Sequence, residues 1–401
     1  RQLLKKINPN LLGGGIASGK IDFTGEITTK EAKIGRNQFT ISPGQDIQHA
    51  INRAKDTGGG IVWIRAGTYK PTSNIVIPSA IQLIGENTST TIIDFNNTAF
   101  KITATGTSLY TTGTITSIVG GKTVTGSGTA WLANVTTSHQ FFIGQFWYKI
   151  ASVNSNTSIT LAEGYGGGAT FPGAAYRAAK VVKDIEFEEF TIKNSTGTGL
   201  EINDVRNIVI EDLELNANNK GLTITTTSEI KIDNTLVTSS TSNGIEITNS
   251  GFLDVESLSI LSSGGHGMLL NSCRSAPFAF GASDGNTLDG VNVTDCQDVF
   301  LQVEVFSNGG QGIECVSGNT DIIISECLVG DNTSDGIKLT ASSNECKIVN
   351  SQIKDGKAYG VNIAASNCNR NIITENIITG NSSGPYNDLG TNTEIAHNKT
   401  T

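Results

Sequence analysis

The sequence predicts an all-β solenoid, a right-handed parallel β-helix, and two observations support this prediction. The first is composition: 46 glycines against 7 prolines in 401 residues, with only 16% charged residues, favour short strands and tight turns. The second is a repeat, in which a glycine precedes an apolar-x-apolar triplet every 22 to 24 residues. A coil of that length fits three short strands joined by bends. The repeat glycines are Gly199, Gly221, Gly244, Gly267, Gly290, Gly312, Gly336 and Gly360.

Each repeat predicts a strand whose side chains alternate between the core and solvent. The residues one and three after each glycine are apolar, as in Leu200 and Ile202, and we expect them in the core. The residue between them then points outward, and successive coils stack these residues about 4.8 Å apart. We call this outward row the ladder: Glu201, Thr223, Glu246, Leu269, Asn292, Glu314, Lys338 and Asn362.

The chain divides into four predicted parts. A helix is expected near the start, because Ile47, Ala50, Ile51 and Ala54 recur at helical spacing and the glycines at 58–60 end it. Such a helix would cap the open end of a solenoid core. The parts are an N-terminal extension (1–41), the capping helix with the first coils (42–106), an inserted β module (107–172) and the main coils (173–401).

The inserted module is predicted to hold two β-hairpins, which turn at 120–121 and at 154–156. It also concentrates the aromatic residues of the chain. Two interpretations are open: these residues form the core of the module, or they form a carbohydrate-stacking platform in which Trp147 binds substrate. The aromatic residues are Phe141, Phe142, Phe146, Trp147 and Tyr148.

Charge and hydropathy exclude some classes of partner. The formal net charge of -9, without a cluster of lysine or arginine, argues against nucleic acid. No run of about 18 apolar residues occurs, so we expect no membrane insertion. The chain begins at Arg1 without a signal-like segment, so we expect a processed form or a fragment.

The six cysteines all lie in the last third of the chain and lack CxxC spacing, so we expect no metal site, and no other feature suggests a cofactor. Cys273 and Cys296 each lie six residues after a repeat glycine, which should stack them on adjacent coils. A disulfide bridge and a pair of packed thiols both fit this spacing. Cys315 is expected to lie in the core.

Two segments resemble known proteins. Gly59-Gly-Ile-Val-Trp-Ile-Arg-Ala-Gly-Thr-Tyr69, with the coils after residue 199, resembles right-handed parallel β-helix proteins of the pectate-lyase-like superfamily. Thr123-Val-Thr-Gly-Ser-Gly-Thr-Ala-Trp131 in the insert resembles modules of bacteriophage tail proteins. Together the two resemblances imply a tailspike-like protein on a virion tail or on another extracellular or cell surface. Such proteins engage polysaccharide, usually as homotrimers, and sometimes cut it.

Acids on the ladder are candidate catalytic residues, because glycan hydrolysis requires two carboxyl groups about 5 to 10 Å apart. One or two coils can supply that separation. Glu246, which has no cation in its own column, is the freer acid, and Asp289 and Glu314 are further candidates. Asn292, Asp335 and Lys338 are expected to bind substrate on the same face. Glu314 and Lys338 are also adjacent on the ladder, so a simple ion pair explains them equally well.

His266 is the remaining candidate catalytic residue, and it lies in Ser262-Ser-Gly-Gly-His-Gly267 between coils that carry Glu246 and Asp289. It is either an exposed bend residue without a role, or a general base or sugar-binding group. The Gly-His-Gly step loosely resembles a turn of alginate C5-epimerases, but this sequence lacks their Asp-Pro-His type motif.

The leading interpretation is a virion- or surface-associated β-helix that binds polysaccharide, with depolymerisation by an acid pair as an added activity. Two alternatives stay open. One is a secreted polysaccharide lyase or C5-epimerase that uses His266. The other is a structural tail or filament component without catalysis. Whether the protein is an enzyme is therefore left open, with hydrolase and lyase as the candidate classes.

Overall fold

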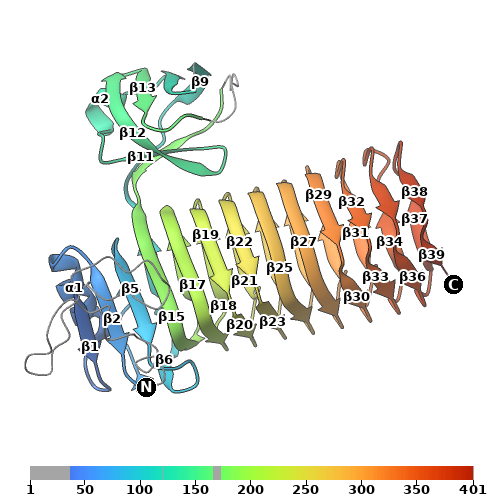
Figure 1. Cartoon of the computed structure of the whole chain (residues 1–401), viewed down its shortest axis with the longest axis horizontal. Helices are drawn as coiled ribbons and strands as arrows, with labels where there is room; N and C mark the ends of the chain where they lie inside the picture. The colour runs from blue at the N-terminus through green and yellow to red at the C-terminus, as the bar shows by residue number, and fades with distance from the viewer. Residues whose placement is uncertain (1–36, 120, 166–172, 401) are drawn as a thin grey trace, which may run out of the picture.

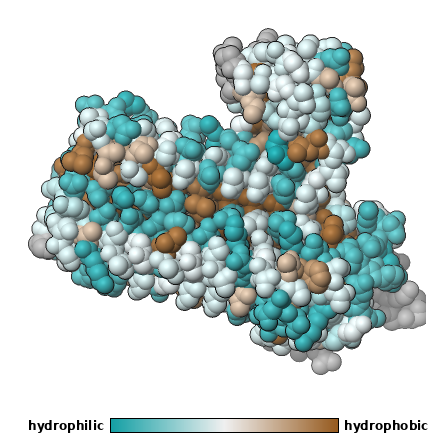
Figure 2. All heavy atoms as spheres, turned by 180° about the vertical axis from the view of Figure 1, so that it is seen from behind, coloured by the Kyte–Doolittle hydropathy of each residue, from teal (hydrophilic) through white to brown (hydrophobic). Residues whose placement is uncertain are grey.

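The computed structural model describes residues 37–119, 121–165 and 173–400. Within these ranges the chain is a right-handed parallel β-helix, an elongated body of stacked coils with a small β module standing off one side near its N-terminal end (Figure 1). Each coil contributes strands to a 21-stranded and an 11-stranded parallel sheet, and the module has its own seven-stranded sheet. Seen from behind, the surface is mostly hydrophilic or neutral, with hydrophobic residues in patches (Figure 2). The predicted fold class is confirmed.

Helix α1 (Ile47–Asp56) packs on the N-terminal end of the core, as the spacing of its apolar residues predicted. The Asp46 side chain begins it by accepting the Gln48 N–H at 2.8 Å, which is the usual role of an N-cap residue. Gly58 and Gly59, with φ angles of 88° and 116°, lead the chain out of the helix into β2 (Gly60–Ile64). This strand pairs with β1 (Gln38–Ile41) and β5 (Ile81–Gly85).

The 11-stranded sheet carries the ladder in the predicted register. Glu201 pairs with Thr223, Glu246 with Leu269, and Glu314 with Lys338, so each outward residue lies beside its counterpart on the next coil. The strands are β4 (Ile75–Val76), β7 (Ile102–Thr105), β16 (Thr198–Asn203), β18 (Lys220–Thr225), β21 (Ile245–Thr248), β24 (Met268–Asn271), β26 (Val291–Thr294), β28 (Ile313–Cys315), β31 (Ile337–Leu339), β34 (Tyr359–Ile363) and β37 (Gly384–Asp388).

The inward residues of the repeat are fully buried, as in Leu200 and Ile202. The repeat glycines leave room for this core. A Cβ atom at Gly267 would lie 2.1 Å from the Ser283 Oγ atom, and one at Gly290 would lie 2.3 Å from the Val305 Cγ1 atom. A side chain at either position would push the first strand away from the core, which explains why glycine marks the repeat.

The 21-stranded sheet contains the other two strands of each coil. Its main-coil strands near the site are β15 (Val182–Ser195), β17 (Val205–Asn216), β19 (Ser228–Asp233), β20 (Thr235–Thr238), β22 (Gly251–Glu256), β23 (Leu258–Leu261), β25 (Arg274–Asp284) and β27 (Gln297–Phe306). The register of β25 against β27 shifts between Ala279 and Ala282, shortly after Pro277, which has no backbone N–H to donate.

Buried asparagine side chains join the bends of successive coils. The Asn308 Oδ1 atom accepts the Asn286 backbone N–H at 3.0 Å, and the Asn332 Oδ1 atom accepts the Asn308 N–H at 3.0 Å. Both groups lie in the core, where an unpaired N–H would be costly. The stack thereby completes hydrogen bonds that the strands leave open at the bends.

Cysteines take similar positions in another stack. All six are free and buried, and the Cys273 N–H donates to the Cys296 Sγ atom at 3.3 Å. Of the two interpretations of this pair, the packed thiols are therefore the one found. Burial and the contact between the two thiols raise the pKa of Cys273 well above its usual value, so that thiol is protonated at neutral pH.

The module contains both predicted hairpins, formed by β9 (Thr114–Val119) with β10 (Thr123–Ser127) and by β12 (Phe146–Ser155) with β13 (Ser158–Leu161). Residue 120 of the first turn lies outside the described residues. The sheet continues past the expected end at 172, because β14 (Arg177–Lys180) pairs with β8 (Thr107–Tyr110) and β11 (Gln140–Ile143). Phe141 packs in the core of the module beside Trp131, which lies in α2 (Trp131–Asn134).

We expect the asparagine stack to contribute strongly to stability. Replacing Asn308 by alanine removes the acceptor of the Asn286 N–H and the donor to the Ser283 carbonyl, both buried. The free energy of unfolding in a urea titration should fall by roughly 2 kcal/mol or more. The control is Asn367→Ala, which removes one exposed side-chain hydrogen bond to Ser342 and should change stability by a few tenths of a kcal/mol. Equal losses in the two variants would contradict this role.

Candidate functional site

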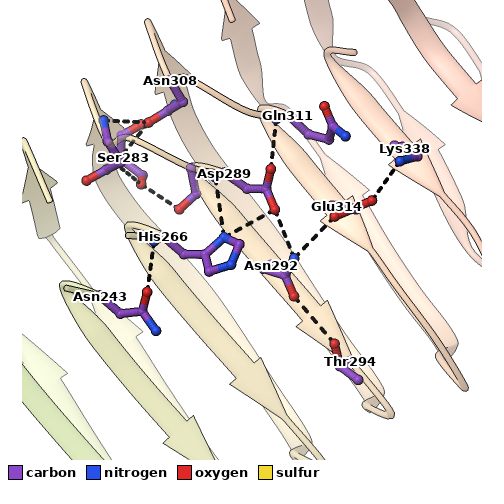
Figure 3. A network of polar contacts seen from close by, with 12 residues as sticks. Asn243, His266, Ser283, Asp289, Asn292, Thr294, Asn308, Gln311, Glu314 and Lys338 are labelled. Atoms are coloured by element: carbon purple, nitrogen blue, oxygen red, sulfur yellow. Dashed lines mark hydrogen bonds and ion pairs between the residues drawn. The ribbon is translucent and has the colours of Figure 1, made fainter. Parts of the chain in front are cut away.

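A second polar column runs beside the ladder. The residue that precedes each repeat glycine lies at the start of the strand, where it faces the ladder residues of its own and neighbouring coils. We call this column, from the second repeat glycine onward, the flank: Lys220, Asn243, His266, Asp289, Gln311, Asp335 and Tyr359. Figure 3 shows how the central flank and ladder side chains point toward one another across adjacent coils.

Flank side chains accept hydrogen bonds from backbone N–H groups of the next coil. The Asn243 Oδ1 atom accepts the His266 N–H at 2.9 Å, and the Asp289 Oδ1 atom accepts the Gln311 N–H at 2.8 Å. A Cβ atom at Gly265 would lie 2.2 Å from the Asn243 Oδ1 atom, and one at Gly310 would lie 2.3 Å from the Asp289 Oδ1 atom. Glycines before the flank position therefore admit these acceptors and fix their orientation.

His266 and Asp289 form the pair at the centre of the site (Figure 3). The His266 Nδ1 atom lies 3.2 Å from the Asp289 Oδ2 atom and 3.3 Å from the Asp289 backbone nitrogen. One nitrogen cannot accept the N–H and donate to the carboxylate at once, so the two contacts belong to different protonation states of the ring. The His266 Nε2 atom makes no hydrogen bond with any residue in the described ranges and is left for a ligand.

Asp289 is held as a carboxylate. Burial by itself would raise its pKa, but hydrogen bonds from the His266 ring, the Asn292 amide and the Gln311 N–H outweigh burial and lower the pKa below its usual value. The Asn292 Nδ2 atom donates to the Asp289 Oδ2 atom at 2.9 Å. A carboxylate beside Nδ1 favours the ring form in which Nδ1 carries a proton and Nε2 is free to accept one.

Asn292 also connects Asp289 to Glu314. Its Nδ2 atom lies 3.3 Å from the Glu314 Oε2 atom, and the Lys338 Nζ atom lies 2.9 Å from the Glu314 Oε1 atom. The expected ion pair between Glu314 and Lys338 is present. Because both carboxylates contact the same nitrogen atom, their nearest oxygen atoms lie no farther apart than glycosidic acid pairs require.

Glu246 is not the free acid that its own column suggested. The Lys220 Nζ atom lies 2.5 Å from the Glu246 Oε2 atom, and the Asn243 Nδ2 atom donates to the Oε1 atom at 2.7 Å. Both partners belong to the flank, so an inspection of the ladder column alone could not find them. Glu246 also lies beside Leu269, which separates it from Asn292 and the central group.

The network continues toward the C-terminus. The Asp335 carboxylate accepts the Tyr359 N–H at 3.0 Å and the Asn362 amide at 2.8 Å, and Asn387 donates to the Asn362 Oδ1 atom at 3.0 Å. Asp335 and Lys338 therefore lie on the same face as the central pair, next to Glu314. The structure brings seven of the candidate residues together on this face: Glu246, His266, Asp289, Asn292, Glu314, Asp335 and Lys338.

Trp147 lies outside this group. Its side chain is buried, and its Nε1 atom donates to the Thr226 carbonyl at 2.7 Å, so it anchors the module to the β-helix. Phe142 packs against it with ring centroids 4.9 Å apart. A stacking platform would require exposed rings, and these two rings are covered.

Sequence reasoning missed Gln311, Lys220 and Asn243. The signal was present, because each precedes a repeat glycine as His266 and Asp289 do. Gln311 lies at the edge of the central pair, and its Oε1 atom is buried without a hydrogen-bond partner in the described structure. It is a further candidate for contact with a ligand.

A possible metal-binding group lies away from this face. One ligand atom each from Glu188, Glu189 and Asp212 lies within 4.8 Å of the others, on β15 and β17. Burial, together with the charges of Asp212 and Glu211, raises the pKa of Glu189. Carboxylates of this kind suit a divalent cation chemically, but the group makes no contact with the His266–Asp289 pair.

The arrangement supports binding more directly than hydrolysis by an acid pair. Hydrolysis needs one carboxyl group that holds a proton, yet Asp289 has a lowered pKa and Glu314 is paired with Lys338. The free Nε2 atom of His266, by contrast, can accept a proton or a hydrogen bond from a ligand hydroxyl. Lys338 and Gln311 add donors beside it.

The sequence matches the family described as the right handed beta helix region over residues 178–279 and 243–400. Among solved structures, the A-module of the Azotobacter vinelandii mannuronan C-5 epimerase AlgE6 is 16% identical, with 88% of this chain and 94% of that chain covered and a TM-score of 0.55. The Agl-KA catalytic domain is 14% identical, with 89% and 66% covered and a TM-score of 0.55.

The Gp54 tailspike of Acinetobacter baumannii bacteriophage AP22 is 13% identical, with 88% and 67% covered and a TM-score of 0.44, too low to bear on function. At these identities the similarities establish the fold alone. No curated protein showed significant sequence similarity. Among the described residues, no helix is long and apolar enough to cross a membrane.

The lowered pKa of Asp289 gives a pH-dependent contribution to stability. Because the folded-state pKa lies below the unfolded value, the contribution is complete above the usual pKa of an aspartate and is lost as the pH falls through the folded pKa. We expect Asp289→Asn to be roughly 1 kcal/mol less stable at pH 7, with the gap closing as the pH falls below the usual pKa of an aspartate and through the lower pKa of Asp289 in the folded protein. Urea titrations across this range measure it. A constant gap would contradict an ionised Asp289.

Proposed function

We propose that this chain, which belongs to the family described as the right handed beta helix region, binds a polysaccharide along the ladder and the flank. The single observation that carries the proposal is the connected row of polar side chains on the 11-stranded sheet, with the free Nε2 atom of His266 at its centre.

A linear glycan suits such a surface chemically. It presents hydroxyl donors and acceptors at regular intervals, and the two columns offer amides, carboxylates, an ammonium group and an imidazole at the regular spacing of the coils. Most of these side chains are already oriented by hydrogen bonds to neighbouring coils, so binding would cost little ordering of side chains.

If the protein is also an enzyme, the His266–Asp289 pair favours proton abstraction over hydrolysis by an acid pair. A histidine oriented by a buried carboxylate can remove a proton from a ligand, which is the first step of a lyase or C5-epimerase. The acid pair expected for a hydrolase finds less support, because each acid is already bound. Proton abstraction by His266 is therefore the second candidate function.

The proposal also includes an extracellular site of action, on a virion tail or a cell surface, and assembly as a homotrimer. Both belong to this proposal through the resemblance to tailspike proteins. Measurement of the molar mass in solution tests the second, because a monomer would remove the homotrimer from the proposal and leave the single-chain glycan face unchanged.

The proposal is tested by incubating the protein with a panel of bacterial capsular and exopolysaccharides. We expect retention of at least one polymer in affinity electrophoresis, and His266→Ala and Asp289→Asn to weaken that retention. If the polymer is modified, a lyase yields a product that absorbs in the ultraviolet, a hydrolase yields reducing ends only, and an epimerase changes the uronate ratio in the NMR spectrum. His266→Ala should then reduce the rate roughly 100-fold or more.

The matched control is His49→Ala, which removes an exposed histidine on α1, far along the chain from the ladder. It should leave retention and any activity unchanged. Retention of a polymer that survives both His266→Ala and Asp289→Asn would place the binding surface elsewhere. Failure to retain any polymer in the panel would favour a purely structural component.

A further inference from the structure

A cleft of about 470 Å³ lies where the inserted module overhangs the β-helix, around the sheet corner from the ladder. Its walls come from β12 of the module and from the first residues of β17, β19 and β22. Figure 1 shows the module above this edge of the coils. The cleft is lined by aromatic rings and by one cluster of charges, and the function proposed above does not use it.

The walls of the cleft are held firmly. The buried Trp147 donates to the Thr226 carbonyl, and Gln145 donates to the Asn249 Oδ1 atom at 3.2 Å. A Cβ atom at Gly251 would lie 2.5 Å from the Phe146 Cε1 atom, so glycine there lets the module approach closely. The cleft is therefore a defined feature of the fold, and a ligand would meet a surface that is already formed.

Phe252 is the unusual residue of the cleft. It lies at a bend that recurs once in each main coil, and the residue at this bend has a positive φ angle. The φ angle of Phe252 is 51°. Phenylalanine is poorly suited to this conformation, whereas asparagine and aspartate adopt it readily. The residues at this position on the other coils are all polar: Asp184, Asn207, Glu229, Ser275, Asp298, Asp321, Glu345, Arg370 and Asn392.

Contact with the module covers only part of the Phe252 side chain. Its ring centroid lies 4.1 Å from that of Phe146, yet 54% of the residue remains exposed. Among the described coils, the one that carries an aromatic ring at this bend is one of the three coils that line the cleft beneath the module. An exposed ring in an unfavourable backbone conformation is a feature expected of a binding site.

Tyrosines supply the polar side of the cleft. Tyr148 and Tyr165 lie with ring centroids 5.8 Å apart. Burial, followed by the nearby Tyr165 and Glu163, raises the pKa of Tyr148 to about 12, so its hydroxyl remains a hydrogen-bond donor at neutral pH. In the described part of the chain that hydroxyl has no hydrogen-bond partner.

The charges that line the cleft disfavour an anionic ligand. The Arg206 Nε atom lies 2.8 Å from the Glu229 Oε1 atom, and its Nη2 atom lies 3.4 Å from the Glu163 Oε2 atom. Among the described residues that line the cleft, the one guanidinium is therefore already paired with two carboxylates and offers no free cation to a sulfated or uronate-rich sugar. Carboxylates paired in this way can still accept hydrogen bonds from sugar hydroxyls.

From these observations we infer that the cleft between the module and the β-helix is a second glycan site, which binds a neutral oligosaccharide with a sugar ring stacked on Phe252. The apolar face of a pyranose matches the exposed ring, and its hydroxyls match Tyr148, Glu163 and Glu229. This inference is independent of the ladder and goes beyond the function proposed for it.

The test uses the whole chain and an array of neutral, uronate-containing and sulfated oligosaccharides, followed by titration calorimetry with the best neutral binder. We expect Phe252→Asn to weaken binding at least tenfold without loss of thermal stability, because asparagine occurs at the same bend in Asn207 and Asn392. Tyr148→Phe should weaken binding by a smaller factor. Leu132→Asn, which removes an apolar residue of the module that is 59% exposed, should bind as the unmodified chain does.

His266→Ala distinguishes the two sites, because it should leave binding of the neutral oligosaccharide unchanged while weakening retention of the ladder polymer. Binding of acidic glycans only, or undiminished binding by Phe252→Asn, would overturn the inference. So would the absence of any neutral binder on the array. Self-association of the chain that is lost in Phe252→Asn, without glycan binding, would instead assign the cleft to a second copy of the protein.

Discussion

Hydrogen bonds between one coil and the next at the bends hold this molecule together. Strand pairing satisfies the backbone within the sheets, but every coil must bend three times, and each bend leaves N–H groups without a strand partner. In the core, Asn286, Asn308 and Asn332 supply the missing acceptors. On the surface, Asn243 and Asp289 do the same for the next flank residue. Both columns require residues with a short polar side chain at a fixed place in each coil.

The candidate site arises from that same structural requirement. A residue that must accept an N–H from the next coil is held in one orientation, and its second polar atom then points along the surface. Asp289 uses one carboxylate oxygen for the Gln311 N–H and presents the other to His266 and Asn292. The scaffold thereby orients the His266–Asp289 pair without a dedicated loop, because folding itself fixes the position of Asp289.

The sequence contained most of the fold because the fold repeats. Spacing alone located the coils, the inward core, the ladder and the capping helix, and period-2 alternation assigned the outward residues correctly. The spacing could not show that a long side chain extends from the flank to the ladder, so the ion pair between Lys220 and Glu246 was not predicted. Nor could it separate buried from exposed aromatic rings, so the sequence left open whether Trp147 lies in the core of the module or on a carbohydrate-stacking surface. The unusual position of Phe252 could be recognised only from the positive φ angle of its bend, which the sequence does not show.

The position of the module within its coil has an evolutionary consequence. Strand β7 precedes the module and β16 follows it, yet the two are direct neighbours, with Ile102 beside Leu200. The coil before the insertion stacks on the coil after it without a gap, and β15 pairs with both β5 and β6 (Thr91–Thr98). An accessory domain can therefore be gained, exchanged or discarded at a coil boundary with no change to the rungs on either side. A change in what the module contacts therefore need not change the shaft of stacked coils that carries it.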